Sequence, residues 1–274
     1  MKNLKLVAVA TLLALSTGAK AQELFVFTEP ASNMPSKSVG VRITNEGIFN
    51  KGAMNRTIPE VMIGFNKNLM AHIQGFFSDM DGKYRLEGGS IYGKYRFLSA
   101  DGTRQHLRAA VFGRLSTSKR PVYTQDINLE GDNKGWQGGL IVTQLLRKLA
   151  LSGTVSYARA FNTDQSATGH AGMEGLPLSD QMIGYSISSG YLVLPVVYKN
   201  YNQPNFNVYL ELLGKTNPVN GTSYLDAAPA IQAIINSRTR IDLGYRFQVS
   251  GDMAGRYTKN MYVVRAEFNF FNIL

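Results

Sequence analysis

Residues 240–250, Arg-Ile-Asp-Leu-Gly-Tyr-Arg-Phe-Gln-Val-Ser, decide the fold class because their side chains alternate strictly between two kinds. One set is apolar and consists of Ile241, Leu243, Tyr245, Phe247 and Val249. The intervening positions carry charged residues, a glycine and a glutamine. Successive side chains of a strand point to opposite faces, so the stretch predicts a strand with one apolar and one polar face.

The same alternation recurs from residue 38 to the end of the chain. It is clearest in Ser90–Leu98, Arg104–Ser116 and Tyr262–Phe270, which have no charge on the apolar face. Weaker segments are Ser38–Thr44, Glu60–Asn66, Leu69–Ser78, Trp136–Leu145, Leu149–Phe161, Met182–Pro195, Asn205–Leu213 and Tyr224–Ile235. The alternation in Trp136–Leu145 is ambiguous, and Pro195 and Pro229 fit strand ends or bulges better than strand middles. With no amphipathic helix of ordinary length between the segments, we predict an all-β chain of about twelve strands.

The connections between these segments alternate in length. Four are tight turns, such as Asn236–Thr239, whereas Thr117–Gly135 and Asn162–Asp180 far exceed ordinary hairpin loops. The medium-length Val196–Pro204 is an exception where a short turn is expected. Short turns at one end and long loops at the other are typical of an antiparallel, up-and-down transmembrane β-barrel.

The start of the chain predicts export. A basic N-terminus precedes the apolar run Leu6–Leu15 and then Ala19-Lys20-Ala21, an Ala-x-Ala cleavage site, so residues 1–21 are interpreted as a cleavable signal peptide. The formal charge of the 274 residues is +10, and removing this stretch, with its three lysines and no acid, leaves +7. The absence of cysteine excludes disulfides, an N-terminal lipid-modified cysteine and thiolate metal sites.

These features together resemble a Gram-negative outer-membrane β-barrel over nearly the whole mature chain. The most specific part is the last predicted strand, whose outer face is Tyr262, Val264, Ala266, Phe268 and Phe270. It resembles the signal read by the barrel-assembly machinery, although Phe271-Asn272-Ile273-Leu274 follow where such a signal usually ends on an aromatic residue. Residues 27–38 and Tyr185–Leu213 resemble a small family of uncharacterised barrels, which implies a fold and an outer-membrane location but no activity.

A soluble β-sandwich or a lipocalin-like barrel shares the alternation but buries its apolar face. Two features favour the membrane barrel. Aromatic residues recur towards segment ends, as interface girdles require, and arginines occupy mid-strand positions on the polar face.

The polar faces predict a lumen that favours anions. The side chains expected to line it are Arg42, Lys94, Arg96, Arg108, Arg114, Arg240, Arg246 and Arg265, with the acids Glu60, Glu211, Asp242 and Glu267, a net charge of about +4. Arginine binds carboxylate and phosphate through two parallel hydrogen bonds. The resulting hypothesis is a small channel for passive or facilitated diffusion of small polar, mainly anionic, solutes, without covalent chemistry.

Two alternatives remain open. Residues 22–37 precede the barrel, residues 38–274, and either enter the lumen as a plug or hang in the periplasm. A plugged barrel would have a structural or partner-binding role through its external loops. Arg240–Asp242 and Arg265–Glu267 would then serve only to fasten neighbouring strands together.

An outer-membrane hydrolase is the third hypothesis, and the motifs do not favour it. The three histidines, His72, His106 and His170, form no His-x-Ser pair, and Asp79-Met80-Asp81 has no Asp-x-His partner. Asp164, His170 and Glu174 in one long loop, and Asp126, Glu130 and Asp132 in the other, match no compact metal site. We therefore predict no catalytic residues, no metal and no cofactor.

The expected partners follow from location and charge. The outer surface would meet membrane lipid and lipopolysaccharide, the last strand the assembly machinery, and the lumen a small polar solute. The basic residues are spread along the strands rather than clustered, so nucleic acid is not expected. The sequence gives no oligomeric state.

Overall fold

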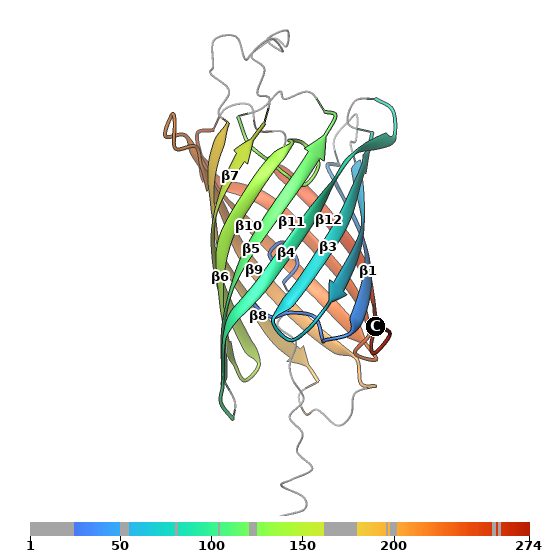
Figure 1. The fold of residues 1–274 in the computed structure, drawn as a ribbon. Coiled ribbons are helices and arrows are strands. Elements are labelled where there is room, and N and C mark those ends of the chain that lie inside the picture. Colours follow the sequence, from blue (N-terminus) through green and yellow to red (C-terminus); the bar gives the residue numbers. More distant parts are fainter. Residues whose placement is uncertain are drawn as a thin grey trace, which may run out of the picture.

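The computed structural model describes residues 25–49, 55–79, 82–103, 105–120, 125–161, 180–195, 197, 202–253, 256 and 259–274. The predicted signal peptide, residues 22–24, Asp81 and the predicted loop residues Asp164, His170 and Glu174 lie outside these ranges. Twelve antiparallel strands form a closed barrel in which each strand pairs with its neighbours in sequence and β1 pairs with β12 (Figure 1). The predicted fold class is confirmed.

Each predicted segment overlaps one strand, and for β3 the bounds agree. The greatest differences are at β2, which begins at Asn55 rather than Glu60, and at β4, which spans Arg85–Asp101 rather than Ser90–Leu98. The strands are β1 Ser38–Gly47, β2 Asn55–Gly64, β3 Leu69–Ser78, β4 Arg85–Asp101, β5 Gln105–Ser118, β6 Gly135–Leu146, β7 Leu149–Ala160, β8 Gln181–Leu194, β9 Asn205–Thr216, β10 Ser223–Ile235, β11 Thr239–Gly251 and β12 Asn260–Phe270.

One proline contradicts its predicted placement. Pro229 lies within β10, where it is paired with Leu210 of β9, whereas Pro195 follows the end of β8 as expected. On the opposite edge, the pairing of β10 with β11 passes from Ala227 to Ala230 without a partner for Pro229. Proline lacks the N–H that this ladder needs, and the barrel accepts the gap because β9 still holds the strand.

The barrel carries its apolar side chains on the outside. Ile91, Leu115, Val155 and Ile187 are 59% to 66% exposed although each lies within a strand. The inward side chains include fully buried Arg56, Arg240 and Lys94. A soluble barrel would bury the apolar face instead, so this is the arrangement of a barrel that spans a lipid bilayer.

The two ends of the barrel differ. The tight turns and the C-terminus lie at one end, here called the turn end, and the long connections lie at the other, the loop end (Figure 1). In outer-membrane barrels the short turns are periplasmic. The described residues contain no helix long and apolar enough to cross a membrane.

Candidate functional site in the barrel lumen

The N-terminal residues 25–37, here called the inner segment, lie inside the barrel. Phe25 and Val26 are 2% and 1% exposed and belong to an apolar cluster with side chains of β6, β7, β9, β10 and β12. Lys37 reaches the turn end, where its backbone N–H donates to the Gly64 carbonyl over 2.7 Å. The described part of the predicted 22–37 segment therefore occupies the lumen rather than the periplasm.

A single buried carboxylate of β9 holds the beginning of this segment. Glu211 is fully buried, and its Oε1 accepts the backbone N–H groups of Val26 and Phe27 at 2.9 and 2.8 Å. Its Oε2 accepts the hydroxyls of Thr28 at 2.6 Å and Ser188 at 3.0 Å. Glu211 thus satisfies backbone donors that would otherwise be buried without a partner.

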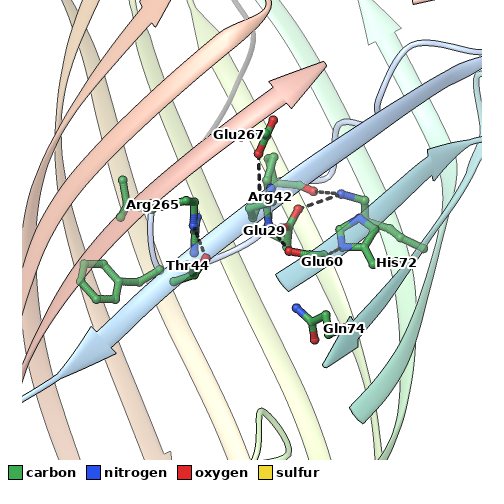
Figure 2. Close-up of polar contacts among 12 residues, drawn as sticks. Glu29, Arg42, Thr44, Glu60, His72, Gln74, Arg265 and Glu267 are labelled. Atoms are coloured by element: carbon green, nitrogen blue, oxygen red, sulfur yellow. Dashed lines mark hydrogen bonds and ion pairs between the residues drawn. The ribbon is translucent and has the colours of Figure 1, made fainter. Parts of the chain in front are cut away.

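The middle of the inner segment places a carboxylate among lumen cations, as Figure 2 shows around Glu29 and Arg42. The Arg42 guanidinium lies 3.0 Å from Glu29, and the Lys94 ammonium lies 3.7 Å from the same carboxylate. The fully buried Lys94 also donates to the carbonyl oxygens of Pro30 at 2.6 Å and Ser32 at 2.8 Å. All these partners of Lys94 belong to the inner segment.

Two further lumen residues complete the docking of this segment. Arg108 of β5 donates to the Ser32 hydroxyl over 2.8 Å, and Thr143 of β6 accepts the Ala31 N–H over 2.9 Å. The segment is therefore held by polar side chains and by three apolar contacts. These contacts are the Phe25–Val26 cluster, a cluster of Ala31 with Ala110 of β5 and Ile141 of β6, and a cluster of Met34 with methionines of β2 and β3.

An ion-pair network on β1, β2, β11 and β12 surrounds Arg42. Arg42 contacts Glu60 at 3.1 Å and Glu267 at 2.8 Å, and Glu60 in turn contacts the buried His72 at 2.5 Å. Arg240 bridges Asp242 at 3.2 Å and Glu267 at 2.8 Å. Neighbouring strands place these residues directly opposite one another, because Arg42, Glu60 and Glu267 share one register level.

Arg265 joins this network differently from the prediction. It lies 3.7 Å from Asp242 and donates to the Thr44 hydroxyl at 3.1 Å (Figure 2 shows the latter contact). Glu267, the predicted partner of Arg265, instead binds Arg42 and Arg240. The outward side of β12 carries Val264, Phe268 and Phe270, while Tyr262 donates to Asn45 at 3.0 Å and Ala266 is partly buried.

The connection between β5 and β6 folds into the loop end of the lumen. Residues 125–134 of this connection, here called the inner loop, place Asp126 2.8 Å from Lys215 of β9 and 3.0 Å from the Tyr224 hydroxyl of β10. Glu130 binds Arg114 of β5. Ile127 and Leu129 pack against small and apolar side chains of β7, β8 and β10.

A second acid of the inner loop, Asp132, binds two arginines, Arg56 of β2 and Arg120. Asn128 donates to the other oxygen of Asp132 over 2.7 Å. The loop is thus tied to opposite sides of the barrel and covers the lumen.

Glu29 of the inner segment and Glu130 and Asp132 of the inner loop are held ionised. Burial by itself raises the pKa of Glu29, but the charges of Arg42 and Lys94 outweigh it and leave that pKa well below its ordinary value. Burial likewise opposes ionisation of Glu130 and Asp132. The charge of Arg114 lowers the pKa of Glu130, and those of Arg56 and Arg120 lower the pKa of Asp132.

A cavity of about 230 Å³ separates the inner segment from the inner loop. It is lined by Thr28 and Glu29 of the segment, by Asn128 to Glu130 of the loop, and by the strand wall between them. At about 30 Å³ per water molecule, the cavity has room for a small cluster of waters or a small solute. The described lumen is therefore obstructed twice, with a chamber lined by both polar and apolar side chains between the obstructions.

The walls of this lumen differ in chemistry. β6, β7 and β8 contain one charged residue, the exposed Arg159, and present hydroxyls inward. The remaining strands, the inner segment and the connections at the loop end supply the charges.

The charged side chains directed into the lumen fall into two sets. The cations are Arg42, Arg56, Lys94, Arg96, Arg108, Arg114, Arg120, Lys215, Arg240, Arg246, Arg256 and Arg265. The acids are Glu29, Glu46, Glu60, Glu87, Asp126, Glu130, Asp132, Glu211, Asp226, Asp242 and Glu267.

These described charges nearly balance, so the predicted lumen charge of about +4 is too high. The predicted inward cations do lie on the lumen side, but most contact an acid. Arg246 contacts Asp226 at 2.5 Å, and Arg96 donates to the Lys67 carbonyl at 2.5 Å near the turn end. The count failed because it left out the acids of the inner segment, the inner loop and several strand positions.

Some of the missed residues were accessible from the pattern. Arg56 lies two steps of the alternation before Glu60, and Lys215 lies two steps after Glu211, so longer predicted strands would have included both. Asp226 lies in the same alternation as the inward Tyr224 and Gln232 of β10, so the predicted strand already contained the signal for it. The contacts of Glu29 had no local signal.

The acids considered for catalysis or metal binding have structural partners. Asp79 accepts the backbone N–H of Asn55 at 2.7 Å and its side-chain amide at 2.8 Å. Asp126, Glu130 and Asp132 each contact a different cation instead of converging. Within the described ranges, no group of three or more potential ligands is positioned to hold a metal ion.

Solved structures share this fold. The chain is similar to the COG4313 outer membrane channel from Pseudomonas putida F1, with a TM-score of 0.57 and 11% identity over 90% of this chain and 100% of that one. The KdgM porin (TM-score 0.49, 9% identity, 85% and 99% covered) and the NanC porin (0.48, 13%, 85% and 98%) are also similar. The sequence matches no family model and no curated protein. The first of these likenesses, together with the apolar exterior, shows that the chain has the fold of an outer-membrane β-barrel.

Proposed function

We propose that this protein is a narrow outer-membrane channel for the diffusion of small polar, preferentially anionic, solutes, without a catalytic step. The observation that carries the proposal is the chamber of mixed polar and apolar lining inside a lipid-facing barrel, bounded by pieces that noncovalent contacts hold in place. The hydroxyls of β6–β8 offer a solute hydrogen-bonding partners on one side of the lumen, while the remaining strands supply the fixed charges. The similarity to a channel of the same strand architecture supports this use of the fold.

The anion preference belongs to the open state. With Glu29 in place, the described lumen charges nearly cancel. When the inner segment leaves, the lumen loses that acid, while Arg42, Lys94 and Arg108 stay on the wall. A narrow pore with excess positive charge concentrates anions.

Planar-bilayer recording of purified, refolded protein under a salt gradient tests this function. We expect stepwise openings with a reversal potential that shows anion preference, and Arg108→Glu should shift it towards cations. Lys148→Glu, a charge reversal at the tight turn between β6 and β7, is the matched control. A correctly folded barrel that stays silent at all voltages and salt concentrations would contradict the proposal.

The plugged barrel is the second candidate, and a specific observation favours it: both the inner segment and the inner loop occupy the described lumen. A barrel closed in this way would act through its external loops. Shortening the β5–β6 connection distinguishes the two candidates. Loss of partner binding with unchanged conductance supports the plugged barrel, and increased conductance supports the channel.

The expected partners remain proposals. The apolar exterior fits membrane lipid, and exposed basic residues at the loop end fit lipopolysaccharide. The outward Val264, Phe268 and Phe270 of β12 keep the pattern of an assembly signal, and the chain continues past Phe270 to Leu274.

A further inference from the structure

Lys94 is a buried ammonium whose direct partners, among the described residues, all come from the inner segment. Its side chain is fully buried, and it contacts the Pro30 and Ser32 carbonyls and the Glu29 carboxylate. It projects from the middle of β4, a fixed part of the wall. A buried ammonium without a partner is strongly destabilised, so removing the inner segment requires another anion or water to take its place.

Arg42 lies beside this ammonium and is bound to fixed acids as well. Glu60 and Glu267 hold its guanidinium from the neighbouring strands, and Glu29 is its third carboxylate (Figure 2). The fixed acids orient Arg42 whether or not Glu29 is present. Arg42 therefore keeps its orientation when Glu29 leaves, while Lys94 remains on the wall beside it and needs a new anionic partner.

We propose that Lys94 and Arg42 form a carboxylate-binding site of the conduction path and that Glu29 is its internal ligand. A solute carboxylate takes the place of Glu29, and the middle of the inner segment gives way. The proposal deepens the channel function above and rests on it. It identifies the solute class as small carboxylates and makes the solute itself the agent that opens the pore.

The contacts of the segment suit such an exchange. The middle of the segment meets the two cations through acceptors alone, namely the Glu29 carboxylate and the Pro30 and Ser32 carbonyls, and a solute carboxylate can replace these. The Thr28 hydroxyl and the Ala31 N–H are donors, so water takes their place on Glu211 and Thr143. The larger apolar anchors lie on either side, at Phe25–Val26 and at Met34, and the small side chain of Ala31 packs against Ala110 and Ile141 between them. The anchors at the two ends limit the movement to residues 28–32 and allow the segment to return to its docked position.

The absence of cysteine makes a direct test practical. The single variant Ser32→Cys introduces the only thiol, at a position 9% exposed, into the full chain refolded in vesicles. The rate of its reaction with a small neutral maleimide reports how often the middle of the segment leaves the wall. The rate is compared in sodium succinate and in sodium chloride of equal ionic strength.

We expect succinate to accelerate labelling about tenfold, and chloride to have little effect. Adding Glu29→Gln should raise the rate before any succinate is present. Adding Lys94→Gln should remove the difference between the two salts, whereas Lys148→Gln, the same charge loss at a turn, should retain it. Equal rates in the two salts, or an undiminished succinate effect in Lys94→Gln, would overturn the proposal.

The two proposals fail separately. Anion-selective conductance without any succinate effect on labelling leaves the channel standing and removes the carboxylate site. Succinate-dependent labelling in a barrel that never conducts leaves the site standing and removes the channel.

Discussion

Glu211 shows how one residue decides whether the barrel is filled. It is a carboxylate on the wall of β9, yet its partners include two backbone N–H groups and a hydroxyl of the inner segment. Hydrogen bonds to a charged group contribute about 1.5–3 kcal/mol each. Much of the attachment of residues 25–28 to the barrel wall therefore depends on the Glu211 side chain.

Replacing Glu211 by alanine should release the start of the inner segment while leaving the barrel closed. We expect a loss of about 3 kcal/mol in docking free energy, which is more than a hundredfold faster amide exchange at Val26 and Phe27. Hydrogen-exchange mass spectrometry of the refolded protein measures it. Ser189→Ala, which removes an outward hydroxyl bound to the Leu210 carbonyl, is the control. Unchanged protection in Glu211→Ala would show that the apolar cluster alone holds the segment.

Glu130 and Asp132 give the inner loop a defined pH dependence. Their pKa values are lowered in the folded protein, because the arginines outweigh the cost of burial. A depressed carboxyl pKa contributes stability that is fully present above the unfolded value and is lost as the pH falls below it. The docked loop should therefore be insensitive to pH from neutrality down to the ordinary carboxyl range.

Below that range, protonation should weaken the pairs with Arg114, Arg56 and Arg120. We expect the frequency of channel opening to stay flat from pH 7 to about 5 and to rise as the pH falls further, since ordinary carboxyl pKa values are near 4. Asp132→Asn should give frequent opening at every pH. Bilayer recordings on both proteins check this, and a transition centred near neutrality would assign the gate to another group.

At the scale of the strands, glycines make room for what lies inside. A Cβ on Gly244 of β11 would come within 2.7 Å of the Phe27 ring. The absence of a side chain at Gly244 therefore leaves room for the Phe27 ring of the inner segment. A Cβ added to Gly93 of β4 would have no neighbouring atom within 4 Å. The two glycines occupy the same kind of strand and differ in what they face.

Gly244→Ala should displace Phe27 and leave the strand ladder intact. Overpacking of this kind costs about 1–3 kcal/mol, so we expect easier proteolysis of the inner segment with an unchanged barrel. Limited proteolysis in vesicles, alongside the heat-dependent shift of the barrel on an unboiled gel, measures both effects. Gly93→Ala should behave like the parent protein. Equal protease sensitivity of the two variants would contradict the packing of Phe27 against Gly244.

At the scale of the whole molecule, the outer belt determines how the barrel sits in lipid. Ile187 is 66% exposed and lies at the middle of β8, whereas Val193, 41% exposed, lies near its end. An arginine costs about 2–4 kcal/mol at the bilayer midplane and at most about 1 kcal/mol near the interface. Ile187→Arg should accordingly destabilise the folded barrel much more than Val193→Arg.

Urea unfolding of both variants in phospholipid vesicles gives the comparison. In a soluble detergent-free barrel, both exposed positions would tolerate arginine equally. Similar losses at the two positions would therefore contradict the placement of the bilayer around the middle of the strands.

The sequence alone determined the barrel wall. The alternation in segments such as Arg240–Ser250 is a property of each strand by itself, because neighbouring side chains of an extended chain point to opposite sides whatever the partner strand is. It therefore predicted the twelve strands and the inward direction of Arg42, Lys94 and Glu211, while the alternating lengths of the connections predicted the antiparallel order. It was ambiguous at Trp136–Leu145 because Ile141 and Leu145 face the lumen, where they pack against the inner segment's apolar residues.

Only the tertiary structure decided what occupies the lumen inside that wall. Whether residues 22–37 enter the lumen was left open, since Val26 meets Glu211 across 185 residues of sequence and neither position signals the other. The same holds for the inner loop, whose acids pair with cations such as Arg56 of β2, Arg114 of β5 and Lys215 of β9 only after the barrel has closed. The faces of the strands are fixed by local backbone geometry, whereas the occupants of the lumen are fixed by closure of the whole barrel, which brings distant charges into one low-dielectric space where they must pair.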